Sequence, residues 1–284
     1  SETYLNYSLI DLQLMIGKGK NQKLISDLEI SQAKDYLCEQ ADVNFQLKSL
    51  FKIELNNSKL FSLFDEIEIP LLKVLAEMEI EGINLDIKFL ESLKKDLITD
   101  ISTLEKLIYT EAGENFNISS PKQLGEVLFE KMQLVKNPKK TKTGQYSTSE
   151  DILKDLSIEH EFVKNILKYR SLTKLMSTYV DSLPNQVLNT TNRVHTEYLQ
   201  TVASTGRLSS INPNLQNIPI RTERGREVRK AFIPRDENHF LMAADYSQIE
   251  LRIIASMSEE KNMIEAFNKN EDIHSSTAST VFNI

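Results

Sequence analysis

The 284-residue sequence contains a single cysteine, Cys38, and no apolar run that approaches the length of a membrane-spanning helix. A disulfide within the chain is therefore excluded, and the scarcity of cysteine favours a reducing compartment such as the cytoplasm. Because a spanning helix needs about 20 apolar residues, we expect no membrane insertion. The first residues also lack the shape of a secretion signal.

Positive charge is in the minority, since 34 Lys and Arg residues face 41 Asp and Glu residues and the formal net charge is −7. Taken alone, this balance argues against a nucleic-acid partner. The charge is unevenly distributed, however: residues 121–146 carry +4 and residues 193–235 carry +5, whereas residues 1–120 carry −9 and residues 236–284 carry −6. The two basic blocks favour a local site for an anionic partner, unless they are ordinary solvated surfaces.

An apolar run of five residues, 240–244, leads directly to the carboxylate of Asp245. The run predicts a buried strand, and the spacing of the residues from Gln248 to Ala255 predicts a helix. Asp245 would then lie at a strand end, where the backbone stops pairing and a ligand can approach. A carboxylate in that position suits a hard cation, Mg²⁺ above all. The alternative is a solvated aspartate at a turn.

Helical periodicity dominates the first two thirds of the chain. Apolar residues three or four apart and helix-start patterns predict helices over residues 30–51, 67–81, 86–112, 120–132 and 160–183. Gly82 is typical of a helix C-terminus, and Asp86 and Ser120 are typical of helix N-termini. A capping box at residues 147–150 predicts one more short helix, which ends at Leu156.

Two basic features lie within this helical part. Residues 136–144 are polar, lysine-rich and interrupted by proline and glycine, without a hydrophobic anchor. They are typical of a mobile loop whose lysines bind phosphates without sequence preference, or of an unbound solvated loop. Further on, Arg170 and Lys174 are four residues apart and therefore share one face of their helix.

A polar block begins after residue 202. Alternation over residues 194–202 predicts a strand, and a dense run of hydrogen-bond donors follows it: Arg207, Asn214, Gln216 and Asn217. A packed core cannot use so many amides, because each buried one needs a partner. Such donors can probe the minor groove of a duplex, where every base pair presents an acceptor. Four arginines follow: Arg221, Arg224, Arg226 and Arg229. They could bind backbone phosphates, or some of them could pair with Glu223 or Glu227.

Four polar strings together resemble the family A DNA polymerases, in order and at suitable spacing. They are DYSQIELR at residues 245–252, TGRLSS at 205–210, PNLQNIP at 213–219 and DIH at 272–274. The first is similar to the first palm motif of that family. Strings this long and polar are far more specific than a lone nucleotide-loop pattern, and the similarity runs from about residue 17 to the end of the chain.

The resemblance implies an α+β fold that is mostly helical, with a helical thumb followed by a partial palm sheet. Residues 1–55 would be the end of a 3′–5′ exonuclease-like domain, residues 56–190 the thumb, and residues 191–284 the first part of the palm. The third exonuclease motif has a tyrosine four residues before a metal-binding aspartate, whereas here Tyr36 is followed at that spacing by Gln40. A neutral amide is a poor ligand for a divalent cation, so we expect no proofreading.

The resemblance also implies roles for individual residues. Asp245 and the backbone carbonyl of Tyr246 would bind Mg²⁺ in a two-ion site, and Glu250 would exclude a ribose 2′-hydroxyl, so that Asp245 and Glu250 form the catalytic pair. The expected contacts to the incoming dNTP come from Gln248, Glu250, Asp272 and His274. The expected contacts to primer–template DNA come from Arg207, Asn214, Gln216, Asn217, Arg221, Arg170 and Lys174. On local sequence alone, Asp272 is a good helix N-cap.

Two further motifs of the family do not occur in the sequence. They are a fingers helix that grips the nucleotide and a His-Asp-Glu turn that supplies the second metal carboxylate. We therefore expect a piece of a cytoplasmic, nucleoid-associated DNA polymerase that binds DNA weakly and does not extend a primer alone, with no obligate protein partner. The alternatives are a non-catalytic DNA-binding module derived from a polymerase and an RNA polymerase relative, which Glu250 disfavours.

Overall fold

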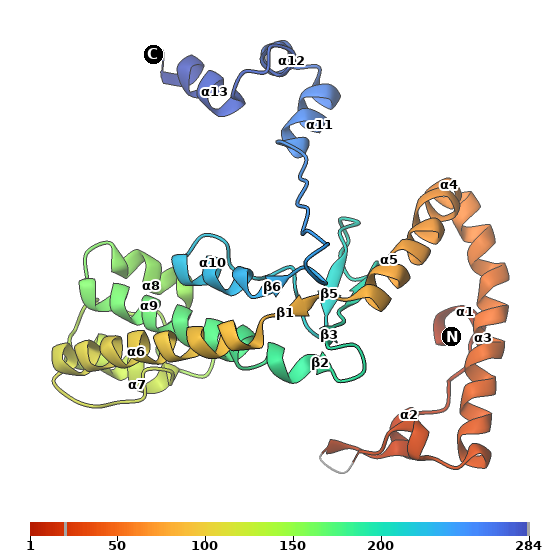
Figure 1. Cartoon of the computed structure of the whole chain (residues 1–284), viewed down its shortest axis with the longest axis horizontal. Coiled ribbons are helices and arrows are strands. Elements are labelled where there is room, and N and C mark those ends of the chain that lie inside the picture. Colours follow the sequence, from red (N-terminus) through yellow and green to blue (C-terminus); the bar gives the residue numbers. More distant parts are fainter. Residues whose placement is uncertain (20–21, 283–284) are drawn as a thin grey trace. The chain divides into compact units, whose positions relative to one another are not determined.

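The computed structural model describes residues 1–19 and 22–282 (Figure 1). The chain divides into two compact units, residues 1–233 and a second unit that begins at Pro234. Helices predominate in both, and the strands are short and antiparallel. The expected mostly helical α+β fold is therefore confirmed. No helix among the described residues is both long and apolar enough to cross a membrane.

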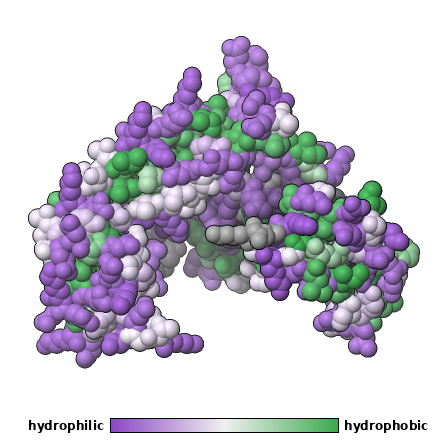
Figure 2. Space-filling view, turned by 90° about the horizontal axis from the view of Figure 1, so that it is seen from below, coloured by the Kyte–Doolittle hydropathy of each residue, from purple (hydrophilic) through white to green (hydrophobic). Residues whose placement is uncertain are grey.

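The first unit opens with short helical turns and one long helix. These elements are α1 (Glu2–Leu5), α2 (Leu12–Ile16), η2 (Ile25–Asp27) and α3 (Ile30–Asn57). Glu39 of α3 holds the N-terminal segment, because its carboxylate accepts hydrogen bonds from the Tyr7 hydroxyl at 2.6 Å and the Ile10 amide at 2.8 Å. Ala33 and Val43 are the buried residues of α3, and Figure 2 shows apolar side chains on the surface of this N-terminal region.

The helical region that follows contains nine helices or helical turns among the described residues. They are α4 (Phe61–Leu63), η3 (Phe64–Glu68), α5 (Ile69–Glu81), α6 (Ile87–Ala112), α7 (Pro121–Glu126), η4 (Val127–Lys131), α8 (Glu150–Ser157), α9 (Glu161–Leu175) and η5 (Met176–Val180). Helix α9 packs against both α6 and α8, so that these three lie side by side (Figure 1). Figure 2 shows a mainly hydrophilic outer face over this region.

Two apolar cores stabilise the first unit, and α6 contributes to both. Leu90, Leu93 and Leu97 belong to a core completed by η5, the short strands and α10 (Glu223–Lys230). About three to four turns later, Ile108 and Ala112 belong to a second core with α7, η4, α8 and α9. A 26-residue helix with apolar residues every three or four positions can bury one stripe against both neighbours.

The helix ends follow the predicted capping chemistry in most cases. The Asp86 carboxylate accepts from the Phe89 amide at 2.9 Å, and the Ser120 hydroxyl accepts from the Gln123 amide. Helix α5 ends at Gly82, as expected. The capping box predicted at residues 147–150 was wrong: α8 begins after Ser149, whose hydroxyl makes no capping bond. The helix predicted to run to residue 183 changes at Met176 to the wider turn η5.

The strands are shorter than predicted. They form three antiparallel pairs, β1 (Asn84–Leu85) with β6 (Phe232–Ile233), β2 (Val187–Leu188) with β3 (Arg193–Val194), and β4 (Glu197–Leu199) with β5 (Ser209–Ile211). A 3₁₀ turn, η6 (Leu183–Gln186), precedes β2. The strand predicted over residues 194–202 is interrupted at residues 195 and 196. The His195 ring lies 2.7 Å from the Glu79 carbonyl oxygen of α5, and Thr196 Oγ1 lies 2.6 Å from Ser210 Oγ of β5.

The loop predicted to be mobile, at residues 136–144, has a defined structure. Residues 139–147, which we call the basic hairpin, fold back on themselves with hydrogen bonds from the Ser147 amide to the Lys139 carbonyl at 2.9 Å and from the Thr141 amide to the Gln145 carbonyl at 2.7 Å. The predicted loop itself has no hydrophobic anchor, but Tyr146, which follows the lysine-rich run, anchors the hairpin. Tyr146 packs against Phe129 of η4, with ring centroids 5.4 Å apart.

The second unit begins with an irregular segment and continues with helices. It contains α11 (Ile249–Ser258), α12 (Lys261–Asn268) and α13 (Ile273–Phe282), around a small core of Ala255, Ala266, Phe267 and Ile273. The helix predicted after Gln248 is confirmed. The strand predicted over residues 240–244 was wrong: this segment is irregular and its side chains are exposed. A strand needs a neighbour for its backbone groups, and the described part of this unit contains no other strand.

Gly82 provides a test of how α5 is joined to the strands. Its φ of 61° is unfavourable for other residues, and an added Cβ would lie 2.6 Å from the Val194 carbonyl oxygen and 2.7 Å from His195 Nδ1. We expect Gly82→Ala to lower the free energy of unfolding by about 3 kcal/mol, as backbone strain and overpacking combine. Urea unfolding measures the change.

Gly206→Ala is the matched control, because Gly206 has a φ of 77° and no atom within 4 Å of the added Cβ. It should cost only the backbone term of about 1–2 kcal/mol. Equal losses in the two variants would show that the close approach of Val194 and His195 contributes nothing to stability.

Candidate functional site

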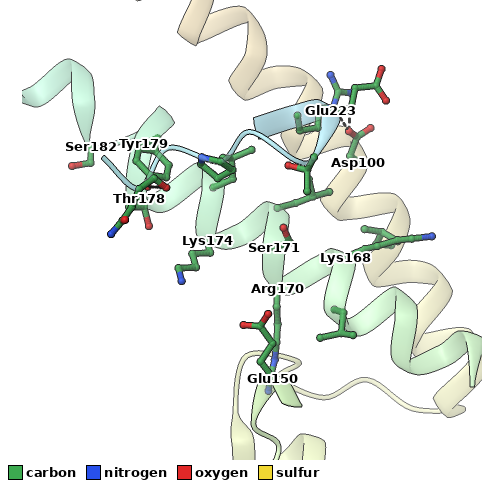
Figure 3. Close-up of a pocket in the computed structure, with 18 of the residues that line it drawn as sticks. Asp100, Glu150, Lys168, Arg170, Ser171, Lys174, Thr178, Tyr179, Ser182 and Glu223 are labelled. Atoms are coloured by element: carbon green, nitrogen blue, oxygen red, sulfur yellow. Dashed lines mark hydrogen bonds and ion pairs between the residues drawn. The ribbon is translucent and has the colours of Figure 1, made fainter. Parts of the chain in front are cut away.

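A large groove lies within the first unit, between the helical region and the polar loop that precedes α10 (Figure 3). Its volume is about 1890 Å³. Side chains of α6, α8, α9, η5, η6, α10 and the loop at residues 212–222 line it. Four of the residues predicted to contact DNA are among them: Arg170, Lys174, Asn214 and Asn217. Arg207, Gln216 and Arg221 are exposed residues of the same unit that do not line it.

The groove has more basic than acidic side chains, and the acidic ones are partly paired. Glu150 lies 2.8 Å from Lys154, and the hydrogen bond from Lys154 lowers the pKa of the Glu150 carboxyl while raising that of the ammonium. Among the described residues, neither Lys168 nor Lys174 has an ion-pair partner at salt-bridge distance. The two unpaired ammonium groups give the groove an excess of positive charge.

Arg224 is paired with two carboxylates and is therefore not an uncompensated cation. Its guanidinium lies 2.7 Å from Asp100 of α6 and 2.7 Å from Glu227 of its own helix. The hydrogen bonds that Arg224 donates to Glu227 and then to Asp100 raise the pKa of its guanidinium against the opposing effect of burial. Arg224 thereby fastens α10 to α6 at the edge of the groove. The expectation that part of the arginine run pairs with Glu223 or Glu227 is confirmed for Arg224.

Arg170 also has a protein partner. Its Nη1 donates to the Thr148 carbonyl oxygen at 2.8 Å, and its Nη2 donates to the Thr148 hydroxyl at 3.3 Å. Thr148 is buried, and Arg170 is half-buried. Burial lowers the pKa of the Arg170 guanidinium, although an arginine remains charged in a protein. The sequence spacing placed Arg170 beside Lys174, but gave no sign of this bond.

The polar loop at residues 212–217 is fixed from beneath by buried hydroxyl groups. Thr196 Oγ1 lies 2.6 Å from Ser210 Oγ and donates to the Pro213 carbonyl oxygen at 2.8 Å or to that of Ile211 at 3.0 Å. The Leu215 amide donates to Ser210 Oγ at 3.1 Å. Thr196 and Ser210 are both buried. In a low-dielectric interior such a hydroxyl network specifies one loop conformation.

The Asn214 side chain and the Asn217 backbone are held by further hydrogen bonds. Asn214 Oδ1 accepts from the backbone amides of Gln216 at 3.0 Å and Asn217 at 3.2 Å, which closes a local turn. The Tyr179 hydroxyl donates to the Asn217 carbonyl oxygen at 2.5 Å and ties the loop to η5. Because its oxygen is used in the turn, Asn214 has its NH₂ group left to donate. All three amide side chains are exposed.

The second unit holds the remaining predicted residues. Asp245 and Tyr246 are exposed on the irregular segment before α11, and Glu250 is exposed in the first turn of α11. Gln248 donates to Asp272 at 3.4 Å, which brings two of the predicted nucleotide contacts together. Because the strand before Asp245 is absent, the expected rigid strand-end position of its carboxylate is corrected to an exposed loop position. His274 is exposed in the first turn of α13.

Asp272 caps α13, as its local sequence predicted. Its carboxylate accepts from the Ser275 hydroxyl at 2.7 Å, from the Ser275 amide at 3.2 Å and from the His274 amide at 3.3 Å. The bond from the Ser275 hydroxyl, followed by the backbone bonds, lowers the pKa of the Asp272 carboxyl. Among the residues that the structure describes, no three His, Cys, Asp or Glu side chains are grouped closely enough to hold a metal ion.

Comparisons with known proteins agree with the resemblance seen in the sequence. The family described as DNA polymerase family A matches residues 87–284. The DNA polymerase I of Borreliella burgdorferi is 44% identical over 284 residues, which is 100% of this chain and 30% of that protein. The DNA polymerase I of Geobacillus stearothermophilus is 44% identical over 96% of this chain and 30% of its own length. The chain thus spans about 30% of these curated relatives.

A solved structure is similar as well. It is the POL domain of Pol1 from M. smegmatis in complex with DNA primer-template and dNTP. The TM-score is 0.77 at 44% sequence identity, and the match covers 84% of this chain and 42% of that one.

The buried hydroxyl pair beneath the polar loop generates a stability prediction. Thr196→Val keeps the shape of the side chain but removes the hydroxyl that links Ser210 Oγ and the Pro213 carbonyl oxygen, so it should lower the free energy of unfolding by about 2 kcal/mol. Thr196→Ser keeps the hydroxyl and should lose only the methyl contribution of about 0.8 kcal/mol. Urea unfolding of both variants measures the difference, and a Thr196→Val protein as stable as Thr196→Ser would contradict it.

Proposed function

This chain belongs to DNA polymerase family A, and from that premise we propose that it is the part of a template-directed DNA polymerase that holds primer–template DNA and carries the first carboxylate of the polymerisation site. The whole protein would add dNTPs to a primer 3′ end. The observation that carries the proposal is the groove of the first unit, which combines unpaired lysines with a rigidly framed loop of amide donors.

The groove suits a nucleic-acid duplex on two counts. Lys168 and Lys174 supply charge that recognises phosphates without regard to sequence, which a copying enzyme requires. Asn214 and Asn217, on the opposite wall, supply amide groups. Amide donors can test the acceptors that every base pair presents in the minor groove, and this tests pair geometry rather than base identity. Arg207, Gln216 and Arg221 extend the proposed DNA contact beyond the groove.

The second unit carries the proposed nucleotide contacts. Asp245 is the proposed catalytic carboxylate, with the Tyr246 carbonyl beside it as a metal ligand, and Glu250 is proposed to exclude the ribose 2′-hydroxyl. Gln248, Asp272 and His274 would contact the incoming dNTP. The exposed positions of Asp245 and Glu250 agree with roles toward a ligand rather than with packing.

The donor set of this chain does not make a complete Mg²⁺ site. A carboxylate is the ligand type that Mg²⁺ prefers, but the described residues offer no group of three metal-binding side chains. A two-ion site needs carboxylates that bridge both ions. We therefore propose Asp245 as one ligand of a magnesium site completed by residues outside this sequence.

The proposed domain division follows the family. Residues 1–55 would be the end of an exonuclease-like domain without proofreading, residues 56–190 the thumb and residues 191–284 the first part of the palm. The proposed partners are primer–template DNA and dNTP, without an obligate protein partner. The proposed location is the cytoplasm, at the nucleoid.

Titration of the purified chain with primer–template DNA at several salt concentrations tests the proposal. Arg207→Ala should weaken binding about 5- to 100-fold, the range for loss of a base contact by arginine. Lys174→Ala should weaken binding to all sequences alike and reduce the slope of log K against log salt by about 1, because one phosphate contact is lost. Asp245→Ala should bind as the unmodified chain does in magnesium-free buffer.

Two results would refute the assignment. If Arg207→Ala binds DNA as tightly as the unmodified chain, the minor-groove role of Arg207 is contradicted. If the slope of log K against log salt is near zero for the unmodified chain, DNA binding by the groove is contradicted. Primer extension is measured in the same samples with Mg²⁺ and dNTPs added. We expect none from this chain, since its metal-ligand set is incomplete.

A further inference from the structure

The basic hairpin, which lies between η4 and α8 in the sequence, has a defined structure and carries exposed lysines. Its turn is closed by the hydrogen bond from the Gly144 amide to the Thr141 carbonyl at 2.9 Å, and Lys140 and Tyr146 form a bridged pair across it. Lys139 and Lys142 are exposed and have no ion-pair partner at salt-bridge distance among the described residues. Such a hairpin could present its lysines in a fixed arrangement, provided that both of its ends are held.

The first contact that holds the hairpin is the close packing of Tyr146 against Gly125. A Cβ added to Gly125 of α7 would lie 2.8 Å from the Tyr146 Cβ, so only glycine allows the hairpin to approach the helix this closely. Phe129 packs against the same ring, and the Lys140 ammonium lies 4.9 Å from its centroid. The aromatic ring therefore joins the hairpin to the second core.

The second contact that holds the hairpin is made by Arg170. Figure 3 shows its side chain leaving α9 and passing Glu150 toward the segment that precedes α8. There it makes the two hydrogen bonds to Thr148, one of them to a buried backbone carbonyl. Thr148 directly follows the hairpin, so Arg170 holds the C-terminal end of the hairpin. Tyr146 holds the residues just before that end. A planar guanidinium can make both bonds at once, whereas the single ammonium of a lysine cannot reproduce their fork geometry.

We propose that Arg170 is a positioning residue, which holds the basic hairpin so that Lys139 and Lys142 form a fixed site for the backbone phosphates of a nucleic acid. The inference deepens the proposed function and rests on it. Because the lysines are already held in place, binding costs less conformational entropy of the loop and its side chains. Arg170 acts through Thr148, and the phosphate contacts are made by the lysines.

Hydrogen exchange of the DNA-free chain tests the positioning role directly. Arg170→Lys retains the charge but loses the paired bonds to Thr148. We expect the amides of Thr141 and Ser147 to exchange about tenfold faster in this variant, because the hairpin opens locally, while the amides of α6 report that the fold is intact. Lys168→Met removes a charge from the same helix without touching the hairpin and should leave hairpin exchange unchanged.

Salt-dependent binding of primer–template DNA tests the consequence. Arg170→Lys should reduce the slope of log K against log salt by about 2, although the net charge is the same, because both hairpin lysines lose their fixed positions. Lys142→Ala should reduce the slope by about 1 and leave hairpin exchange unchanged. Both results support the proposal.

Two results would overturn it. Hairpin exchange that is equal in Arg170→Lys and the unmodified chain shows that Arg170 does not hold the hairpin. Faster exchange with an unchanged salt slope shows that the held lysines do not bind phosphates. Failure of the proposed function is seen separately, as absence of DNA binding by the unmodified chain, and the exchange measurement does not depend on it.

Discussion

The burial of one helical stripe supports most of the first unit. Leu97 and Ile108 of α6 are completely buried, each in a different core. Burying such side chains contributes about 1.5–3 kcal/mol each, and a single helix therefore couples the strand-bearing core to the core under the basic hairpin. Asp100 lies between the two in the sequence of α6 and holds α10 through Arg224. The walls of the groove are positioned from this one helix.

The helices could be predicted because their signals are local. Apolar spacing identified α3, α5, α6 and α9, and the caps at Asp86 and Ser120 fixed two starting points to the residue. The strands could not be predicted as well, because a strand depends on partners far away in the sequence. The run at residues 240–244 has the composition of a buried strand but no neighbour in the described part of its unit, so its apolar side chains remain exposed.

The same distinction applies to the candidate site. The sequence identified the residue types of the groove, with Lys174, Asn214 and Asn217 on its walls. It could not identify Thr196 and Ser210, which are 14 residues apart and meet only because β4 pairs with β5. Threonine and serine are common in loops, and nothing in their local pattern distinguishes a buried hydroxyl pair. Arg170 and Thr148, 22 residues apart, were hidden for the same reason.

The pairing within the groove also resolves the conflict between a net charge of −7 and a proposed nucleic-acid partner. Acidic side chains would repel phosphates only if their charge were uncompensated. Arg224 offsets one of the two charges of Asp100 and Glu227, and Lys154 offsets the charge of Glu150, at 2.7–2.8 Å. Among the described residues, Lys168 and Lys174 have no ion-pair partner at salt-bridge distance. Unpaired charges at greater distance are screened within about 10 Å at 0.1 M salt. The local arrangement of ion pairs, rather than the composition of the chain, therefore determines the charge that the groove offers to the proposed nucleic-acid partner.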